Sequence, residues 1–255
     1  MAQFSELLRD NIPDALLAQL VEQGTLNPSA TGSSPVQRTL KEENMRNFTD
    51  ITLLLDASAS MWNNRHETIS GVNKFITEQK AVGDNAALTL IVFNGTAKTL
   101  FAGKKIADVQ LLTNEDYCPG GSTAYYDTTA RAIEAAGLRF RKMPAERRPD
   151  KVLFVIMTDG QDTDSWMYGK LGLEECKSRI QHQRDKYSWD FAFLGANIDA
   201  KSVAATIGIP AGFSMNYVGD QTGTSRGLDN VTSSVVMYRS RVAGTQREGN
   251  FFQQP

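Results

Sequence analysis

The chain has 255 residues, of which 41% are apolar, and its 27 basic residues nearly balance 29 acidic ones, for a net charge of -2. This length can bury a full core, so we expect one large domain with extensions. The balanced charge shows no footprint for nucleic acid. No stretch approaches the ~20 apolar residues of a membrane span, and the N-terminus lacks the features of a secretion signal. We therefore expect no nucleic-acid partner, no membrane span and a cytoplasmic location.

The first 47 residues are expected to form a helical arm and a linker. Apolar residues recur at helical spacing over residues 4–21, and Gly24 ends the pattern. The following stretch to residue 47 mixes Gly, Ser, Thr, Pro and Asn, which is typical of an extended linker. We therefore expect the domain itself at 48–243 and a polar C-terminal tail at 244–255.

Within that domain, apolar runs bounded by polar residues predict buried strands. Four such runs lie at 51–55, 86–93, 152–157 and 191–196. Residues 99–102 are expected to add an antiparallel edge strand. Segments with helical apolar spacing separate the strands, at 69–76, 126–133 and 173–187. Alternating strands and helices predict an α/β fold, with a doubly wound, mostly parallel sheet and helices on both faces.

A last apolar stripe, at 228–242, repeats at spacings of three and four residues. The first interpretation is a final helix that packs on the sheet. Assembly as a coiled coil is the alternative, but the stripe covers only about two heptads and lacks a clear charge pattern.

Oxygen-bearing side chains follow two of the predicted strands. Asp56 ends the first, and Ser58 and Ser60 follow at alternate positions; Asp159 comes directly after the strand at 152–157. Ligands of open α/β sheets bind beyond the carboxyl ends of strands. Carboxylate and hydroxyl oxygens suit Mg²⁺, Mn²⁺ or Ca²⁺, and no His or Cys in the motif favours a softer metal. The alternative is that these residues only cap the next helix.

A third segment lies between these two. Residues 119–123 form a glycine turn that delivers Thr123 at the start of a predicted helix. Together the three parts, in this order, resemble the metal-ion-dependent adhesion site of von Willebrand factor type A domains, and the resemblance covers roughly residues 48–220. Ala59 departs from the pattern, because family members often carry glycine there. The segment 193–200 is similar to the intracellular bacterial and phage type of the family.

This resemblance implies a set of metal-binding residues. They are Asp56, Ser58, Ser60, Thr123 and Asp159. The hydroxyls would bind Mg²⁺ (or Mn²⁺ or Ca²⁺) directly, and the two acids would bind directly or through water. Neutral hydroxyl ligands leave much of the cation's charge uncompensated, so the open position attracts an Asp or Glu carboxylate of a protein partner. The expected function is a metal-dependent protein-binding module.

Several nearby residues have a functional and a simpler interpretation. Asp127 resembles a recurrent acid of the family, but solvation on a helix surface or a hydrogen bond behind Thr123 explains it more simply than ligation does. Asp162 and Asp164 either enrich a negative rim or play an ordinary loop role. Trp62 either anchors an interface or packs against the neighbouring helix.

The chain has two cysteines, so a disulfide framework is absent and a reducing compartment is the simplest inference. Cys176 lies on an apolar helical stripe and is expected in the core. Cys118 lies in the loop before Thr123, where a small packed side chain is the simpler interpretation and a reactive thiol the alternative. Both are predicted to be unpaired.

Two further functions remain open. The chain could be a structural component of a larger assembly such as a phage particle, in which its arms make the contacts and its location is the virion. A metal-assisted hydrolase ranks third, because no general base is suitably placed. No nucleophile elbow, Walker loop or dinucleotide fingerprint occurs. We therefore expect no enzyme, no catalytic residue and no organic cofactor.

Overall fold

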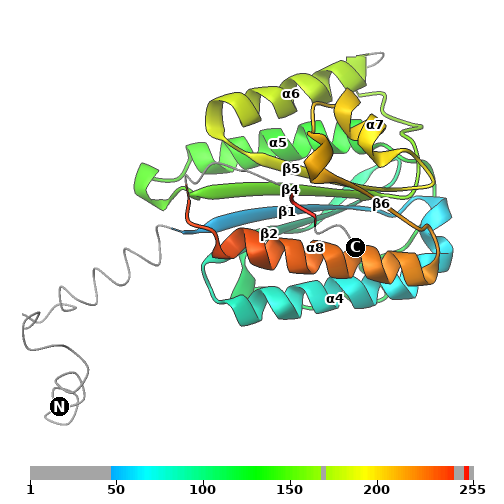
Figure 1. Ribbon diagram of the computed structural model, residues 1–255, viewed down its shortest axis with the longest axis horizontal. Coiled ribbons are helices and arrows are strands. Elements are labelled where there is room, and N and C mark those ends of the chain that lie inside the picture. The colour runs from blue at the N-terminus through cyan, green and yellow to red at the C-terminus, as the bar shows by residue number, and fades with distance from the viewer. Residues whose placement is uncertain (1–46, 168–170, 244–249, 253–255) are drawn as a thin grey trace, which may run out of the picture. The chain divides into compact units, whose positions relative to one another are not determined.

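The computed structural model describes residues 47–167, 171–243 and 250–252 (Figure 1). The predicted arm at 1–47 lies outside these residues, except for Asn47. Six strands form one sheet in the order β3-β2-β1-β4-β5-β6. They span β1 Thr49–Asp56, β2 Ala86–Phe93, β3 Ala97–Lys105, β4 Lys151–Thr158, β5 Asp190–Ala196 and β6 Ser214–Tyr217. Every neighbouring pair is parallel except β2 and β3, so the predicted doubly wound, mostly parallel sheet is confirmed.

Helices cover both faces of this sheet (Figure 1). One face carries α4 Arg65–Val82 and α8 Gln221–Ser240, and the other carries α5 Tyr125–Arg141, α6 Gly172–Tyr187 and α7 Ala200–Thr206. Short 3-10 helices add η1 Ala59–Asn64, η2 Ile106–Asp108, η3 Ala145–Arg147 and η5 Ala211–Phe213. All eight residues of β1 are buried, as expected for a strand covered on both sides.

Two apolar cores follow from the alternation of side chains along the strands. Ile51, Leu53 and Leu55 of β1 join the core under α4 and α8, whereas Leu54 joins the core under α5 and α6. Cys176 is fully buried in the second core, as the sequence predicted. The sheet therefore lies between two apolar cores.

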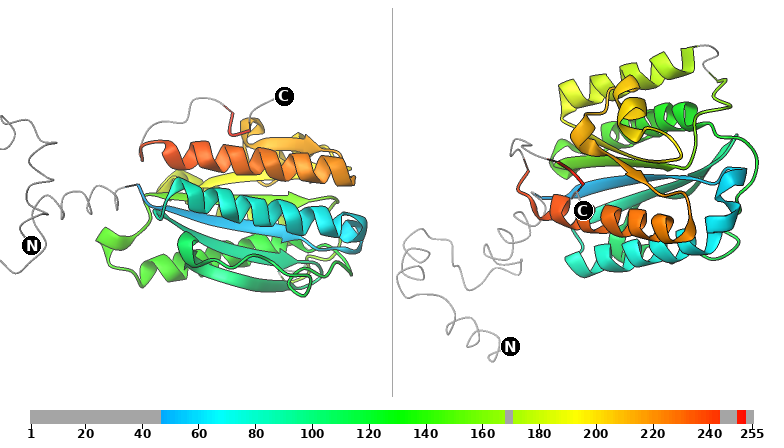
Figure 2. Two further views of the ribbon diagram at one scale, coloured as in Figure 1. Left: turned by 90° about the horizontal axis from the view of Figure 1, so that it is seen from below. Right: turned by 45° about the vertical axis from the view of Figure 1, so that its right-hand side comes forward.

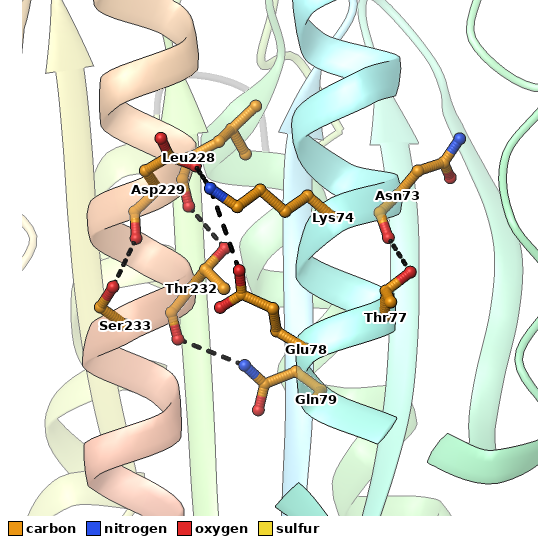
Figure 3. Close-up of polar contacts among 9 residues, drawn as sticks. All are labelled: Asn73, Lys74, Thr77, Glu78, Gln79, Leu228, Asp229, Thr232 and Ser233. Atoms are coloured by element: carbon orange, nitrogen blue, oxygen red, sulfur yellow. Dashed lines mark hydrogen bonds and ion pairs between the residues drawn. The ribbon is translucent and has the colours of Figure 1, made fainter. Parts of the chain in front are cut away.

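Helices α4 and α8 lie side by side along the same face of the sheet (Figure 2). Gly71 permits this approach, because a Cβ atom at that position would lie 2.5 Å from Leu228 Cδ1. Polar contacts flank the seam: Lys74 Nζ bonds Asp229 Oδ1 at 2.8 Å, and Gln79 Nε2 donates to the Thr232 carbonyl at 3.2 Å (Figure 3). The apolar stripe of α8 is buried in the first core at Leu228, Val231, Val235 and Tyr238, which agrees with the packed-helix interpretation rather than with a coiled coil. Val242, the last residue of the predicted stripe, lies beyond the helix and is exposed.

Two features of the fold escaped the sequence prediction. Strand β6 carries no apolar run, and it exists because Ser214–Tyr217 pairs with the end of β5. Phe251 and Phe252 lie in the segment expected to be a polar tail, yet both are buried in the first core. The Phe251 amide also donates to the Gly212 carbonyl at 2.8 Å, so part of the tail completes the domain.

Candidate metal centre

Strands β1 and β4 are parallel neighbours, with Leu55 opposite Met157, so Asp56, which ends β1, and Asp159, which follows β4, lie at the same edge of the sheet. Ser60 Oγ donates to Asp159 Oδ1 at 2.7 Å, and the Ser58 and Ser60 hydroxyls lie 3.1 Å apart. These contacts join residues that are far apart in the sequence. Three of the five residues expected to bind metal therefore form a continuous row of oxygen atoms.

Asp56 is fully buried beside this row. Its Oδ1 accepts the Ser58 amide at 2.7 Å, and its Oδ2 accepts the Thr158 hydroxyl at 2.5 Å. Burial raises the pKa of Asp56, the charge of Asp159 raises it further, and the hydrogen bonds from Thr158 and Ser58 oppose the rise. Each carboxylate oxygen of Asp56 thus already accepts a hydrogen bond.

The glycine turn brings Thr123 to the same edge through its backbone. The Gly120 amide donates to the Ala57 carbonyl at 2.8 Å, and the Ala59 amide donates to the Gly121 carbonyl at 3.1 Å. Gly121 has a φ of +77°, a conformation that favours glycine. The Thr123 amide donates to the Thr163 hydroxyl at 3.0 Å. The turn is therefore fixed both to the loop after β1 and to the loop after β4.

The departure at Ala59 has a structural explanation. Ala59 opens the 3-10 helix η1, whose right-handed backbone any L-residue adopts. Its amide still reaches the Gly121 carbonyl. Alanine at this position therefore leaves the contact between the two loops intact.

These residues fit a small hard cation by the chemistry of their donor atoms. Two ligands of an octahedral Mg²⁺ shell, each about 2.1 Å from the ion, lie about 3 Å apart, and the Ser58, Ser60 and Asp159 oxygens lie 2.7 and 3.1 Å apart. The described part of the chain holds no group of three or more His, Cys, Asp or Glu residues suited to a metal. A cation at this edge would thus depend on hydroxyl oxygens, which disfavours zinc.

Three supporting residues were not found from the sequence. Thr158 bonds Asp56, the Tyr117 hydroxyl donates to the Asp56 carbonyl at 2.6 Å, and Asn197 Nδ2 donates to the Asp159 carbonyl at 3.2 Å. Thr158 directly precedes Asp159, and Asn197 directly follows β5, so both occupy strand ends at which polar side chains are informative. Tyr117 gives no such signal, because it lies in a long irregular loop.

Other expectations receive a definite outcome. Trp62 is 61% exposed, so the larger part of its side chain is open to solvent rather than packed. Both thiols are free, as predicted, but Cys118 is exposed, so the expectation of a packed side chain there was wrong. Asp162 accepts the Tyr126 amide at 3.0 Å, and Asp164 bonds the Ser122 hydroxyl at 2.5 Å. These two acids hold the loops together, which is the structural role that the sequence left open.

Asp127 also differs from the simplest expectation. It is buried rather than solvated on a helix surface, with an exposed fraction of 6%. Its Oδ2 accepts the Met167 amide at 2.7 Å, so it bonds the loop after β4.

The family model for the von Willebrand factor type A domain matches residues 50–234. The chain therefore belongs to this family. Similar solved structures include the vWF domain of the type V pili tip protein Mfa5 from Porphyromonas gingivalis, with 10% identity, a TM-score of 0.54, and coverage of 78% of this chain and 98% of that one. At this identity the likeness concerns the fold alone.

Two larger proteins share the fold. The pilus adhesin SpaC from Lactobacillus rhamnosus GG has 15% identity and a TM-score of 0.54, over 74% of this chain and 30% of that chain. Proximal thread matrix protein 1 from the mussel byssus has 16% identity and a TM-score of 0.53, over 75% and 47%. This chain thus spans less than half the length of either. No curated protein sequence matches it. Among the described residues, no helix has the length and apolar character to cross a membrane.

Proposed function

We propose that this von Willebrand factor type A domain is a metal-dependent protein-binding module and not an enzyme. Asp56, Ser58, Ser60, Thr123 and Asp159 would hold Mg²⁺, with Mn²⁺ or Ca²⁺ as substitutes. When bound, the cation supplies positive charge and an open coordination position for a partner's Asp or Glu carboxylate. The row of oxygens from Ser58 through Ser60 to Asp159 carries this proposal, because it joins two loops at one point.

The residues of the proposed site would have different roles. The Ser58 and Ser60 hydroxyls are neutral, so they orient a cation without cancelling its charge. Hydrogen bonds from the Thr158 hydroxyl and the Ser58 amide fix the orientation of the Asp56 carboxylate. Asn197 and Ser60 hold Asp159 in place. This arrangement supports the attraction of an acidic group.

Exposed apolar side chains occur in the loops that follow three strands of the sheet, and they are candidate contacts for the partner. Trp62 follows β1, Trp166 follows β4 and Val218 follows β6, with exposed fractions of 61%, 69% and 66%. Large apolar side chains that gather in the loops of one edge are typical of interaction surfaces. Trp62 is the anchor that we favour, since it lies two residues after Ser60.

The described neighbours support a binding role. SpaC is named as a pilus adhesin, and Mfa5 as a pili tip protein. The name of SpaC states an adhesive role for that protein. The segment 193–200 leads us to assign this chain to the intracellular bacterial or phage type, with a cytoplasmic or virion location and a possible part in a larger assembly.

A displayed peptide library provides the test, because no partner has to be known in advance. Peptides captured by the immobilised chain in Mn²⁺ and released by a chelator should be enriched in Asp or Glu. Ser58→Ala/Ser60→Ala should lose this enrichment, whereas Ser233→Ala, on the exposed face of α8, should keep it. Equal capture in excess chelator would refute metal-dependent docking and favour the assembly function.

Trp62→Ala separates the partner surface from the metal. This variant should bind Mn²⁺ as the wild type does, because the side chain is exposed, but it should retain the selected peptides about tenfold less tightly. Calorimetry with Mn²⁺ and with one selected peptide measures both values. Unchanged peptide affinity would remove Trp62 from the interface.

A further inference from the structure

We propose a second cation site, of the Ca²⁺ type, where the N-terminus of α5 meets the loop after β4 and the first residue of α6. Its protein ligands would be Asp127 Oδ1 and the Ser165 carbonyl oxygen, next to Gly172. Neither residue belongs to the set proposed for the first site. The inference therefore goes beyond the proposed function and does not depend on it.

The first observation is an unpartnered oxygen atom. Asp127 is only 6% exposed, and its Oδ2 accepts the Met167 amide at 2.7 Å. Its Oδ1 is fully buried and has no hydrogen-bond partner. A buried carboxylate oxygen without a donor costs free energy, so a native protein supplies it with a water molecule or a cation.

The second observation is a small hollow beside this oxygen. A Cβ atom placed on Gly172 would lie 3.5 Å from Asp127 Oδ1 and 3.6 Å from the Ser165 carbonyl oxygen. Both oxygens thus face the space that the missing side chain leaves. A carboxylate and a main-chain carbonyl are ligands that Ca²⁺ accepts at 2.3–2.6 Å in flexible geometry, whereas Mg²⁺ demands a near-ideal octahedron.

The third observation is the charge of the cluster. Ser165 Oγ donates to Asp162 Oδ2 at 2.6 Å and accepts the Asp127 amide at 3.1 Å, so one serine joins the Asp162 carboxylate to the backbone of Asp127. Neither acid belongs to any of the ion pairs found in the described part of the chain. The nearby Arg179 pairs with Glu134 and Glu175. Among the described residues Asp127 and Asp162 thus have no cationic partner, which favours a divalent ion.

A cation at this second site would also stabilise the loop that carries part of the first site. The loop after β4 carries Asp159, and its Thr163 accepts the Thr123 amide at 3.0 Å. Asp162 joins the same loop to the Tyr126 amide in the first turn of α5. An ion between Asp127 and Ser165 would fix this loop at one more point. It would thereby hold Asp159 and Thr123 in their positions relative to each other.

The test isolates the second site by removing the first. In Ser58→Ala/Ser60→Ala protein, calorimetry with Ca²⁺ alone should show one site, and Ca²⁺ should raise the unfolding temperature. Adding Asp127→Asn should lower the Ca²⁺ affinity by about tenfold or more, because the amide removes a charged ligand. Adding Gly172→Ala should do the same by filling the hollow, although it removes no ligand.

Two features keep the outcome clear. Gly172→Ala favours the helix, so a loss of Ca²⁺ binding in this variant is not a failure to fold. Gly137→Ala in α5 is the matched control, because open space surrounds that position, and it should leave Ca²⁺ binding unchanged. Absence of Ca²⁺ binding in the Ser58→Ala/Ser60→Ala protein would overturn the proposal, and so would binding that survives both Asp127→Asn and Gly172→Ala. The first site is judged separately, by Mn²⁺ binding to the wild type.

Discussion

Buried charged side chains have different partners at the two ends of the parallel strands. We call these the amino edge, where β1 and β4 begin, and the carboxyl edge, where they end. At the amino edge, Lys151 Nζ donates to the carbonyls of Tyr238, Arg239 and Arg241 at 3.2, 2.7 and 2.7 Å. These carbonyls end α8, where the helix dipole is negative. At the carboxyl edge, Asp56 and Asp159 face hydroxyls and amides, and within the described residues neither forms an ion pair.

Arg239 is a second buried cation at the amino edge, and it also has acceptors from the protein. It is 1% exposed, and its guanidinium bonds the Gln79 and Gly83 carbonyls at 2.5 and 2.6 Å and the Asn85 side chain at 3.0 Å. Within the described part of the chain, the buried cations at one edge thus have acceptors, whereas Asp56 and Asp159 at the other have no cationic partner. Internal hydrogen bonds thus hold the amino edge, whereas the proposed metal site lies at the carboxyl edge.

The largest expected effect lies at the amino edge. Arg239→Ala should lower the free energy of unfolding by about 3–5 kcal/mol, because several buried acceptors lose their donor at once. Urea denaturation measures this change. The variant that still folds should bind Mn²⁺ normally, and a loss of Mn²⁺ affinity in folded protein would show that the two edges are not separable.

The next effect is a pH dependence at Asp50, near the amino end of β1. Burial raises the pKa of Asp50 to about 6, although its ion pair with Arg139 at 2.8 Å opposes the rise. The folded protein therefore holds a proton that the unfolded chain releases near pH 4. This group stabilises the fold fully below about pH 4, and its contribution is lost as the pH rises through about 6.

The size of that contribution is at most roughly 3 kcal/mol. Urea denaturation at several pH values between about 4 and 7 should show it, and Asp50→Asn should flatten the profile. A wild-type stability that rises steadily over this range, with the same slope in Asp50→Asn, would contradict the assignment.

At the carboxyl edge, Ser58→Ala/Ser60→Ala should weaken Mn²⁺ binding about 100-fold or more, which corresponds to roughly 2.7 kcal/mol. The free energy of unfolding without metal should change by less than about 1 kcal/mol, because the two cores lie elsewhere. Circular dichroism in excess chelator checks that the wild-type fold survives metal removal. Cooperative unfolding on chelation alone would show that this edge also serves stability.

The smallest effect compares two tyrosines beneath the first site. The Tyr217 hydroxyl is buried without a hydrogen-bond partner, whereas the Tyr117 hydroxyl donates to the Asp56 carbonyl at 2.6 Å. Tyr217→Phe should therefore raise the free energy of unfolding by about 1 kcal/mol, and Tyr117→Phe should lower it by a similar amount. Thermal denaturation of both variants without metal measures the signs. Equal signs would indicate that the Tyr217 hydroxyl has a partner such as water.

The sequence predicted best where a pattern repeats over several residues. The runs that became β1, β2, β4 and β5 were found because a covered parallel strand must be apolar throughout. Strand β6 was missed because four residues with mixed side chains carry no period. Phe251 and Phe252 were missed because two aromatic residues in a polar segment do not reveal what they pack against.

The candidate site shows the same limit between what a local sequence pattern predicts and what depends on contacts between distant residues. The sequence by itself determined which oxygen-bearing residues follow which strands, because this order is local to each motif. Only the tertiary structure decided that Ser60 and Asp159, 99 residues apart, lie 2.7 Å from each other. It also decided that Asp127 is buried with one oxygen unpartnered. The physical reason is that β1 pairs with β4 rather than only with its neighbour in sequence, and such pairing depends on how the whole sheet packs between its helices.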